Sequence, residues 1–179
     1  MNDVAYQGVP GAFGEAACLR FLAGWTPVAH ASFEAVAAAV ATGAAERGML
    51  PAENSIAGPV PGVADLVAAR GLAIRARHAL PIALHLLAAP GVALGSIRRV
   101  ASHPVALAQC ARWCAARGLI AEPAPNTAIA ARALAASGEP TLGVAASERA
   151  AAVHGLAIVA RAIHDHNDNV TTFWEIARR

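Results

Sequence analysis

Short runs of β-branched and other apolar residues alternate with alanine-rich helical windows along the whole chain. This pattern predicts strands at residues 4–7, 28–31, 48–50, 100–102, 119–122, 141–145, 156–159 and 170–176. It predicts helices over residues 13–22, 33–42, 63–70, 104–117 and 127–136, and a last helix that begins at Ser147. Such alternation is typical of an α/β protein with mostly parallel sheets and helices packed on their faces.

Residues that cap helices support several of these boundaries. Ser32 can accept a hydrogen bond from the first turn of helix 33–42, and Gly43 follows the last residue of that helix. Asn126 can cap helix 127–136 in the same way. Residues 72–87 are strand-forming but interrupted by Pro81, so we expect two strand segments where the chain crosses between two lobes.

Composition narrows the class of protein. The chain has 179 residues, 56% of them hydrophobic, which suffices for one domain or for two small lobes. The formal net charge is +2 and the positive side chains, all arginine, are scattered, so we expect no nucleic-acid partner. No apolar run is long enough to span a bilayer, so we expect a cytoplasmic protein with no membrane partner.

The three cysteines are Cys18, Cys110 and Cys114. An odd number in a chain of this length argues against a disulfide framework and is typical of a reducing compartment. Cys110 and Cys114 lie one helical turn apart, but no histidine pair or C-x-x-C motif completes a metal site. We therefore interpret this pair as buried thiols on a core-facing helix.

Two motifs suggest cofactor chemistry, and we reject both interpretations. Gly8, Gly11 and Gly14 follow the first strand, but their spacing differs from G-x-G-x-x-G, and His30 stands where a ribose-binding acid is expected. The turn can still present backbone N–H groups to an anion such as a carboxylate. The polar segment 164–169 contains potential metal ligands, yet no distant partner motif is present, so we expect a solvated loop.

Hydroxyl, amide and carboxylate groups gather near the ends of predicted strands, where open α/β sheets bind ligands. They belong to four segments: residues 53–55, 102–104, 126–127 and 169–173. Taken singly, each group has a structural explanation, because Ser102 and Asn126 suit helix N-caps and Thr171 suits a strand. The four segments together are the candidate site.

Taken in order, segments of the chain resemble the prephenate dehydratase family. They are residues 4–8 with the turn 11–15, residues 51–58, Leu80-Pro81-Ile82, Ser102-His103-Pro104 with Ala108-Gln109-Cys110, and residues 169–173. The resemblance extends over nearly the whole chain, and the order and spacing of the motifs make coincidence improbable.

The resemblance implies a two-lobed fold like that of periplasmic binding proteins, with the active site in the cleft between the lobes. We expect residues 1–80 with 160–179 to form the first lobe and residues 81–159 the second. It also implies a homodimer. We expect no ACT regulatory domain, which many family members carry, and therefore no feedback by phenylalanine through this chain.

The resemblance further implies a carbon–oxygen lyase of phenylalanine biosynthesis, which converts prephenate into phenylpyruvate, water and CO2. Thr171 corresponds to the catalytic threonine of the family and is expected to help the ring hydroxyl leave. Glu53 is expected to orient Thr171 or to supply the proton. The residues expected to bind the substrate are Asn54, Ser55, Ser102, His103, Gln109, Asn126, Thr127, Thr172 and Phe173. Neutral donors and helix N-termini can orient a dianion, so we expect no metal or organic cofactor.

Three departures from the family pattern bear on this hypothesis. Thr172 stands where the motif Thr-Arg-Phe usually has arginine, Ala12 and Gly14 replace hydroxyl residues, and residues 125–126 replace an acid and a serine. A hydrogen bond to a charged group is worth ~1.5 to 3 kcal/mol, so an uncompensated loss of the arginine would reduce efficiency by one to two decades. Arg75 and Arg77 are the candidates to replace it.

Two alternatives remain open. The first is arogenate dehydratase, which acts on the amino-acid analogue of the same ring. The second is a protein of the same fold that binds or senses a small carboxylate without catalysis. In that case the missing arginine indicates that catalytic activity has been lost. Turnover separates the enzyme from the binding protein, and a comparison of the two substrates separates the two enzymes.

Overall fold

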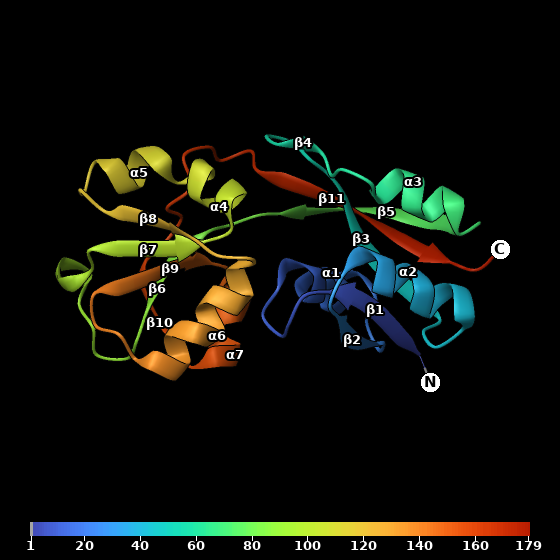
Figure 1. The fold of residues 1–179 in the computed structure, drawn as a ribbon, viewed down its shortest axis with the longest axis horizontal. Helices are drawn as coiled ribbons and strands as arrows, with labels where there is room; N and C mark the ends of the chain where they lie inside the picture. Colours follow the sequence, from blue (N-terminus) through green and yellow to red (C-terminus); the bar gives the residue numbers. More distant parts are fainter. Residues whose placement is uncertain (1) are drawn as a thin grey trace. The chain divides into compact units, whose positions relative to one another are not determined.

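The computed structural model describes residues 2–179 and divides them into two compact units (Figure 1). Unit 1 contains the described residues up to Val9 together with residues 13–82 and 168–179, and unit 2 contains residues 10–12 and 83–167. The chain therefore returns to unit 1 at Asp168, later than residue 160, where we expected it to return. The reason is that residues 161–167 bond within unit 2, where Ile163 N donates to Leu84 O at 2.8 Å.

Unit 1 contains a mixed sheet with the strand order β2-β1-β3-β11-β5, and β4 pairs with β3 outside this order. The strands are β1 (Asp3–Gln7), β2 (Thr26–His30), β3 (Arg47–Asn54), β4 (Gly58–Pro59), β5 (Ala73–Pro81) and β11 (Val170–Ala177). Strand β1 is parallel to both of its neighbours, whereas β11 is antiparallel to both β3 and β5.

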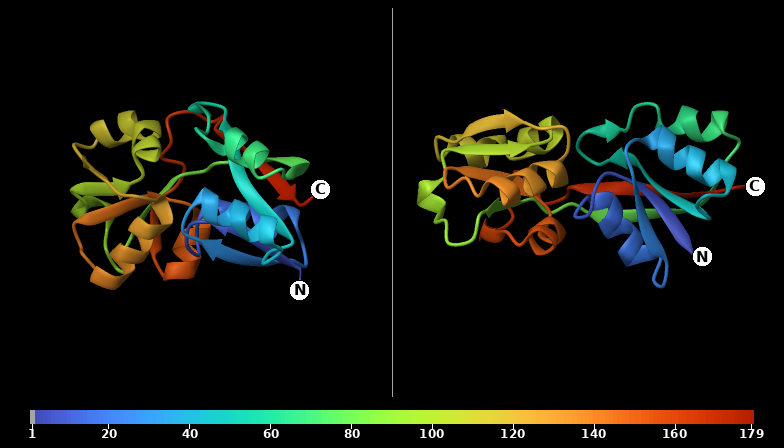
Figure 2. Two further views of the ribbon diagram at one scale, coloured as in Figure 1. Left: turned by 45° about the vertical axis from the view of Figure 1, so that its right-hand side comes forward. Right: turned by 60° about the horizontal axis from the view of Figure 1, so that its bottom comes forward.

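Helices cover both faces of this sheet (Figure 2, right). Helix α1 (Phe13–Phe21) lies on one face, and α2 (Phe33–Thr42) and α3 (Val63–Ala69) lie on the other. A core cluster joins α2 and α3 to the sheet, with Leu50 and Ile176 fully buried. The expected boundaries of α2 are confirmed, because Ser32 Oγ accepts from Ala35 N at 3.2 Å and Gly43 is left-handed with φ of 83°.

Unit 2 contains a second mixed sheet with the strand order β10-β6-β9-β7-β8. The strands are β6 (His85–Ala88), β7 (Arg99–Ser102), β8 (Ile120–Pro123), β9 (Leu142–Ala146) and β10 (Ala157–Ala160). The helices are α4 (Pro104–Gln109), α5 (Ala111–Ala115), α6 (Thr127–Ser137) and α7 (Glu148–His154), with a 3-10 turn η1 (Leu94–Ser96). Strand β7 is parallel to β8 and β9, and β6 is antiparallel to β9 and β10.

The predicted strands and helices are present, but three features differ. The strand expected at residues 48–50 extends from Arg47 to Asn54. The helix expected over 104–117 is interrupted at Cys110, because Asp165 accepts from the N–H groups of Arg112 and Trp113 and starts a new helix there. The sheets are mixed rather than mostly parallel, because β6 and β11 are the first strands after each crossing and no crossover helix sets their direction.

The cysteines are free and buried, as expected for the pair Cys110 and Cys114. Burial raises the pKa of the Cys18 and Cys110 thiols to about 12, so both stay protonated and unreactive near neutral pH. Among residues 2–179, none of the helices combines the length and the apolar character needed to cross a lipid bilayer.

The burial of His85 predicts that the stability of unit 2 depends on pH. Burial lowers the pKa of His85 below 6.5, and its Nδ1 accepts from Ala162 N at 3.1 Å. Below pH 6.5 the unfolded chain takes up a proton here that the folded chain resists, so the free energy of unfolding falls as the pH decreases.

We predict that His85→Gln flattens this dependence, because glutamine keeps an acceptor for Ala162 N but does not titrate. Urea unfolding between about pH 7.5 and about pH 5 measures the slope. The matched control is His166→Gln, since His166 is exposed in the adjoining loop. Equal slopes for the wild type and His85→Gln would contradict the prediction.

Candidate active site

The side chain of Asn54, the last residue of β3, makes the largest set of contacts among the candidate residues of unit 1. Its Oδ1 accepts from Ile56 N at 3.0 Å and from Ala57 N at 2.9 Å, which closes the turn into β4. Its Nδ2 donates to Thr171 Oγ1 at 3.0 Å and to Asn169 Oδ1 at 2.8 Å. Asn54 therefore holds the turn after β3 and the start of β11 together.

The Thr171 hydroxyl is held in one hydrogen-bonding role. Because an amide NH2 group can only donate, the hydroxyl oxygen of Thr171 is the acceptor in its bond with Asn54. Within residues 2–179 the hydroxyl makes no second hydrogen bond, so its own hydrogen can donate to a ligand. Thr171 is 9% exposed, which shields the hydroxyl from most of the solvent.

A β-bulge places Asn54 opposite Thr171. On one side of the bulge, Pro51 pairs with Phe173 and Leu50 with Trp174. If this register continued without a shift, Thr171 would pair with Glu53. The register shifts by one residue before Thr172, so Glu53 pairs with Thr172 and Asn54 with Thr171. Bulges often lie beside active sites and change the direction of a side chain in this way.

The expectation that Glu53 orients Thr171 does not agree with these contacts. Alternate residues of a strand point to opposite faces of a sheet, and Glu53 is paired with Thr172 rather than with Thr171. On β11, Trp174 packs in the core under α2 and α3, so Thr172 belongs to that face and Thr171 to the face of α1. Asn54 supplies the contact that was expected from Glu53.

Ser55 joins β3 to β11. Its Oγ donates to Asp168 O at 2.7 Å and accepts from Val170 N at 2.9 Å, while its own N–H donates to Val170 O at 2.8 Å. These three bonds fix the segment that leads into Thr171. Phe173, another residue expected to bind substrate, is 2% exposed inside unit 1.

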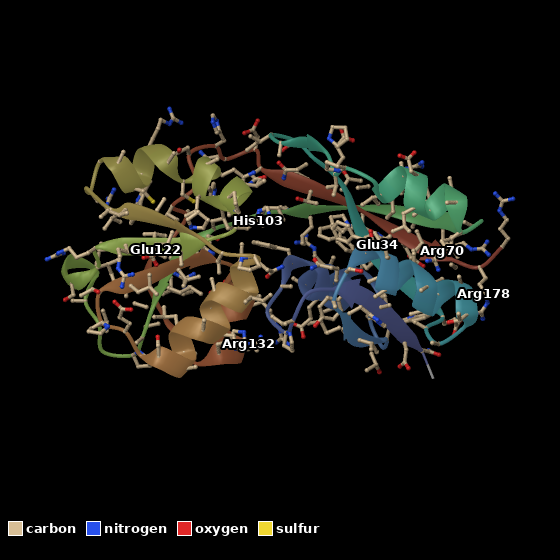
Figure 3. The ribbon with its side chains drawn as sticks, in the orientation of Figure 1. Glu34, Arg70, His103, Glu122, Arg132 and Arg178 are labelled. Carbon is tan, nitrogen blue, oxygen red and sulfur yellow. The ribbon has the colours of Figure 1, made fainter. Side chains whose placement is uncertain are left out.

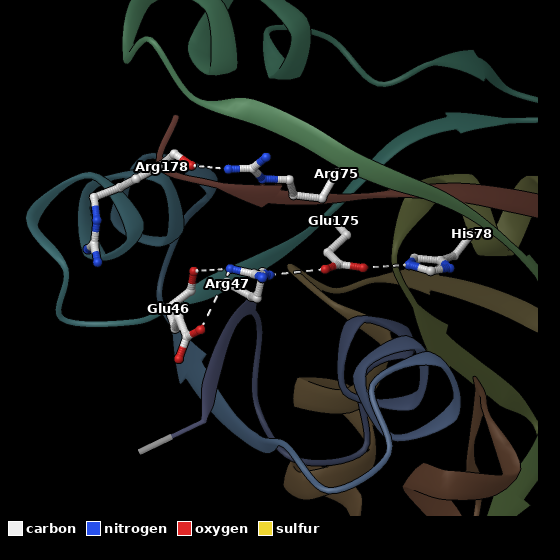
Figure 4. Close-up of polar contacts among 6 residues, drawn as sticks. All are labelled: Glu46, Arg47, Arg75, His78, Glu175 and Arg178. Carbon is white, nitrogen blue, oxygen red and sulfur yellow. Dashed lines mark hydrogen bonds and ion pairs between the residues drawn. The ribbon is translucent and has the colours of Figure 1, made fainter.

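A buried carboxylate further along β11 binds basic side chains on both neighbouring strands (Figure 4). Glu175 accepts from Arg47 Nε at 3.1 Å and lies 3.0 Å from His78 Nε2. The His78 ring stacks on Phe21 of α1 with the centroids 4.6 Å apart. This network ties β3, β11 and β5 together, and the wide separation of its members along the chain left no local pattern to predict it.

The two arginines considered as replacements for the missing arginine lie in different surroundings. Arg75 donates from Nη2 to Arg178 O at 2.8 Å, at the far end of β11 from Thr171 (Figure 4). Arg77 pairs with Trp174 in the register of β5 and β11, and its guanidinium lies 5.8 Å from the centre of the Trp174 ring. Arg77 is therefore the nearer of the two to Thr172 in the sheet.

In unit 2, Ser102 and His103 lie at the end of β7. Ser102 is fully buried and its Oγ donates to Ala145 O at 2.6 Å, so it joins two strands instead of capping the helix as expected. The cap of α4 is His103, whose Nδ1 accepts from Val105 N at 3.2 Å (Figure 3). Gln109 is the last residue of α4 and is 8% exposed.

Asn126 and Thr127 lie at the start of α6. Asn126 Oδ1 accepts from Ala128 N at 2.8 Å, which confirms the predicted cap. Thr127 is half-buried at the first helical position. The start of α6 therefore presents an amide, a hydroxyl and backbone N–H groups, which suit an anionic ligand.

The glycine-rich turn is fixed by packing at Gly11, in unit 2. Gly11 has a φ of 95°, and its carbonyl accepts from Ser147 Oγ at 2.9 Å. A Cβ atom at this position would lie 2.9 Å from Ala150 Cα of α7, so a larger residue would displace the helix. Close packing thus explains this glycine without a dinucleotide.

The polar segment 164–169 makes structural contacts. Its Asp165 carboxylate accepts from the N–H groups of Arg112 and Trp113, and its His164 Nδ1 accepts from Leu84 N at 3.2 Å. Within the described part of the chain, no group of three or more His, Cys, Asp or Glu side chains is arranged to hold a metal ion. Residues 166–168 are exposed, as expected for a solvated loop, whereas Asn169 is 2% exposed.

Taken together, the mixed sheets of the two units and the helices packed on them define an α/β protein, with amide and hydroxyl groups at several strand and helix ends. The sequence agrees with a specific family of such proteins. The chain belongs to the prephenate dehydratase family, whose model matches residues 4–179.

Curated relatives support this membership. Arogenate dehydratase 1 of Petunia hybrida is 41% identical over 177 residues, and arogenate dehydratase/prephenate dehydratase 2 of Arabidopsis thaliana is 39% identical over 175 residues. A bifunctional N-acyl-homoserine lactone acylase/prephenate dehydratase of Komagataeibacter europaeus is 38% identical over 176 residues. Each match covers 98% of this chain, which spans 42%, 46% and 63% of these relatives, respectively.

Solved structures agree on the fold. The prephenate dehydratase of Arthrobacter aurescens in complex with L-Phe has a TM-score of 0.91 and 31% identity, and the match covers 99% of this chain and 60% of that one. A periplasmic substrate-binding protein of an ABC transporter from Coxiella burnetii has a TM-score of 0.52 at 13% identity and covers 100% of this chain and 85% of that one. The second likeness concerns the fold alone and confirms the expected similarity to periplasmic binding proteins.

We predict that Asn126→Ala lowers the free energy of unfolding by about 1 kcal/mol, because α6 loses the acceptor at its N-cap. Asn126→Asp keeps that acceptor and adds a negative charge at the positive end of the helix, so its stability stays close to that of the wild type. Urea unfolding of the three proteins measures both effects. Equal loss of stability in the two variants would show that the cap contributes nothing.

Proposed function

We propose that this chain is the catalytic region of a dehydratase that converts prephenate into phenylpyruvate, water and CO2, with arogenate as the alternative substrate. The observation that carries the proposal is the Thr171 hydroxyl, which accepts from Asn54 Nδ2 at 3.0 Å and keeps its own hydrogen for a ligand. Membership of the family supports the class of reaction. The plant relatives are named for arogenate or for both substrates, so the substrate has to be measured.

The reaction requires little chemistry from the protein. The bond between the ring and its carboxylate breaks, and its electron pair completes the aromatic ring as the bond between the ring and its hydroxyl breaks. The departing oxygen takes up a proton and leaves as water, and the carboxylate leaves as CO2. Because aromatisation drives the reaction, the protein needs to orient a dianion and to assist the departing hydroxyl.

We assign the second task to Thr171. A donor in place beside the departing oxygen typically contributes ~10² to 10⁴-fold to the rate. Thr171 fits because Asn54 occupies a lone pair of its oxygen and turns its hydrogen away from the amide. Glu53 remains the candidate source of the proton, although its register partner on β11 is Thr172.

We assign substrate binding to the residues that the family resemblance implies. In unit 1 these are Asn54, Ser55, Thr172 and Phe173, and in unit 2 they are Ser102, His103, Gln109, Asn126 and Thr127. Hydroxyl and amide groups can bind the two carboxylates without a cofactor. In this role Asn126→Asp raises KM for the dianion by charge repulsion while preserving the cap of α6.

We also propose that the protein is a cytoplasmic homodimer, as the family resemblance implies. Light scattering of the purified chain gives its mass in solution. A monomer at the concentration of the activity assay would remove the dimer from the proposal and leave the assignment of the reaction unchanged.

The deciding experiment is a turnover assay of the purified protein. Prephenate and arogenate are supplied at equal concentration, and phenylpyruvate and phenylalanine are separated and quantified against the spontaneous background. We expect phenylpyruvate formation from prephenate to dominate. Binding of prephenate without turnover would identify a binding protein instead, and faster phenylalanine formation would identify an arogenate dehydratase.

A second candidate activity is hydrolysis of N-acyl-homoserine lactones. It is favoured by one observation, the 38% identity to the bifunctional relative of Komagataeibacter europaeus. Release of homoserine lactone from such a substrate tests it with the same protein preparation. Acylase activity that survives Thr171→Val would show that it uses a different centre from the dehydratase.

We predict that Thr171→Val lowers kcat by at least ~10²-fold, because valine has nearly the same shape but cannot donate a hydrogen bond. Thr171→Ser keeps the hydroxyl and is expected to retain most of the activity. Thr172→Val is the matched control on the neighbouring position and opposite face of β11, and it is expected to change KM rather than kcat. Thermal unfolding verifies that the variants remain folded, and near-normal kcat in Thr171→Val would remove Thr171 from the mechanism.

A further inference from the structure

Asn169 is a buried amide two residues before Thr171. It is 2% exposed, and its backbone carbonyl accepts from Ile82 N at 2.8 Å, which fixes the main chain at this point. Its side-chain Oδ1 accepts from Asn54 Nδ2 at 2.8 Å. The same nitrogen donates to Thr171 Oγ1, so one amide group connects Asn169 with the proposed catalytic hydroxyl.

The orientation of the Asn54 amide is determined by its surroundings. Two backbone donors, Ile56 N and Ala57 N, lie 3.0 and 2.9 Å from one atom of the amide, which must therefore be the oxygen. The nitrogen then faces Asn169 and Thr171. Amide groups are often assigned by such networks, and here the backbone donors exclude the reversed assignment.

The amide nitrogen of Asn54 has more acceptor oxygens within reach than it has hydrogens. Asn54 Nδ2 carries two hydrogens and has three oxygens within reach: Asn169 Oδ1 at 2.8 Å, Thr171 Oγ1 at 3.0 Å and Val170 O at 3.2 Å. Val170 O already accepts from Ser55 N at 2.8 Å. With one hydrogen held by Asn169, the second points toward Thr171 and keeps the threonine oxygen in the accepting role.

We infer that Asn169 is a positioning residue for the dehydratase reaction, which acts on Thr171 through the amide of Asn54. This inference rests on the proposed function of Thr171. Loss of the Asn169 acceptor removes one partner of the half-buried Asn54 amide, and the amide rotates toward its remaining acceptors, which include Val170 O. Thr171 then loses its fixed orientation. The effect falls on the chemical step, because Asn169 acts through the amide of Asn54 on the Thr171 hydroxyl.

The test compares two substitutions at this position. Asn169→Leu has a similar shape and lacks the acceptor, and Asn169→Asp keeps an acceptor oxygen toward Asn54. We expect Asn169→Leu to lower kcat by about tenfold with little change in KM, a smaller loss than that of Thr171→Val because the donor itself remains. Asn169→Asp is expected to retain kcat within about threefold, and thermal unfolding verifies the fold of each variant.

A double substitution distinguishes positioning from a general structural role. If Asn169 acts through Thr171, Asn169→Leu causes no further loss of kcat in a protein that already carries Thr171→Val. Independent, multiplicative losses in the double variant, or an equal loss of kcat in Asn169→Asp and Asn169→Leu, would overturn the inference while leaving the dehydratase assignment in place. Absence of turnover in the wild type would overturn the proposed function and this inference with it.

Discussion

The candidate active site depends on one register shift in the sheet of unit 1. The bulge in β3 beside β11 adds a residue to one strand, and as a result Asn54 instead of Glu53 is paired with Thr171. The amide of Asn54 then uses its oxygen to close the turn into β4 and its nitrogen to hold Asn169 and Thr171. A carboxylate in that place could not donate these bonds, so the shift decides the chemical character of the group beside Thr171.

Many of the candidate side chains also have structural functions. Ser102 joins β7 to β9, and Ser55 forms hydrogen bonds with the segment at the start of β11. His103 and Asn126 cap helices. Asn126 caps its helix through Oδ1, so its amide NH2 group is not used by the cap, whereas Ser55 and Ser102 donate their single hydroxyl hydrogens to backbone carbonyls. These contacts mean that a loss of activity on substitution has to be compared with the stability of each variant. Cap-preserving and shape-preserving substitutions are therefore more informative than alanine at these positions.

The replacement of the family arginine by Thr172 affects a different face of the sheet from Thr171. Trp174 packs under α2 and α3 and marks the face to which Thr172 belongs, whereas Glu175 binds His78, which stacks on α1. The contact that orients the Thr171 hydroxyl is thus independent of residue 172. Arg77 of β5 lies beside Trp174 of β11, so its guanidinium is near Thr172 in the sheet.

The sequence by itself determined the class of fold, the order of the elements and the segments that carry the polar groups. It could do so because periodicity, caps such as Ser32 and Asn126, and helix-ending residues such as Gly43 act over a few neighbouring residues. Only the tertiary structure decided that the sheets are mixed, that Asn54 holds Thr171, and that Glu175 binds Arg47 and His78. Strand direction, register and ion pairs join residues that are far apart along the chain, and a shift of one residue exchanges the two faces of a strand, so no local pattern specifies them.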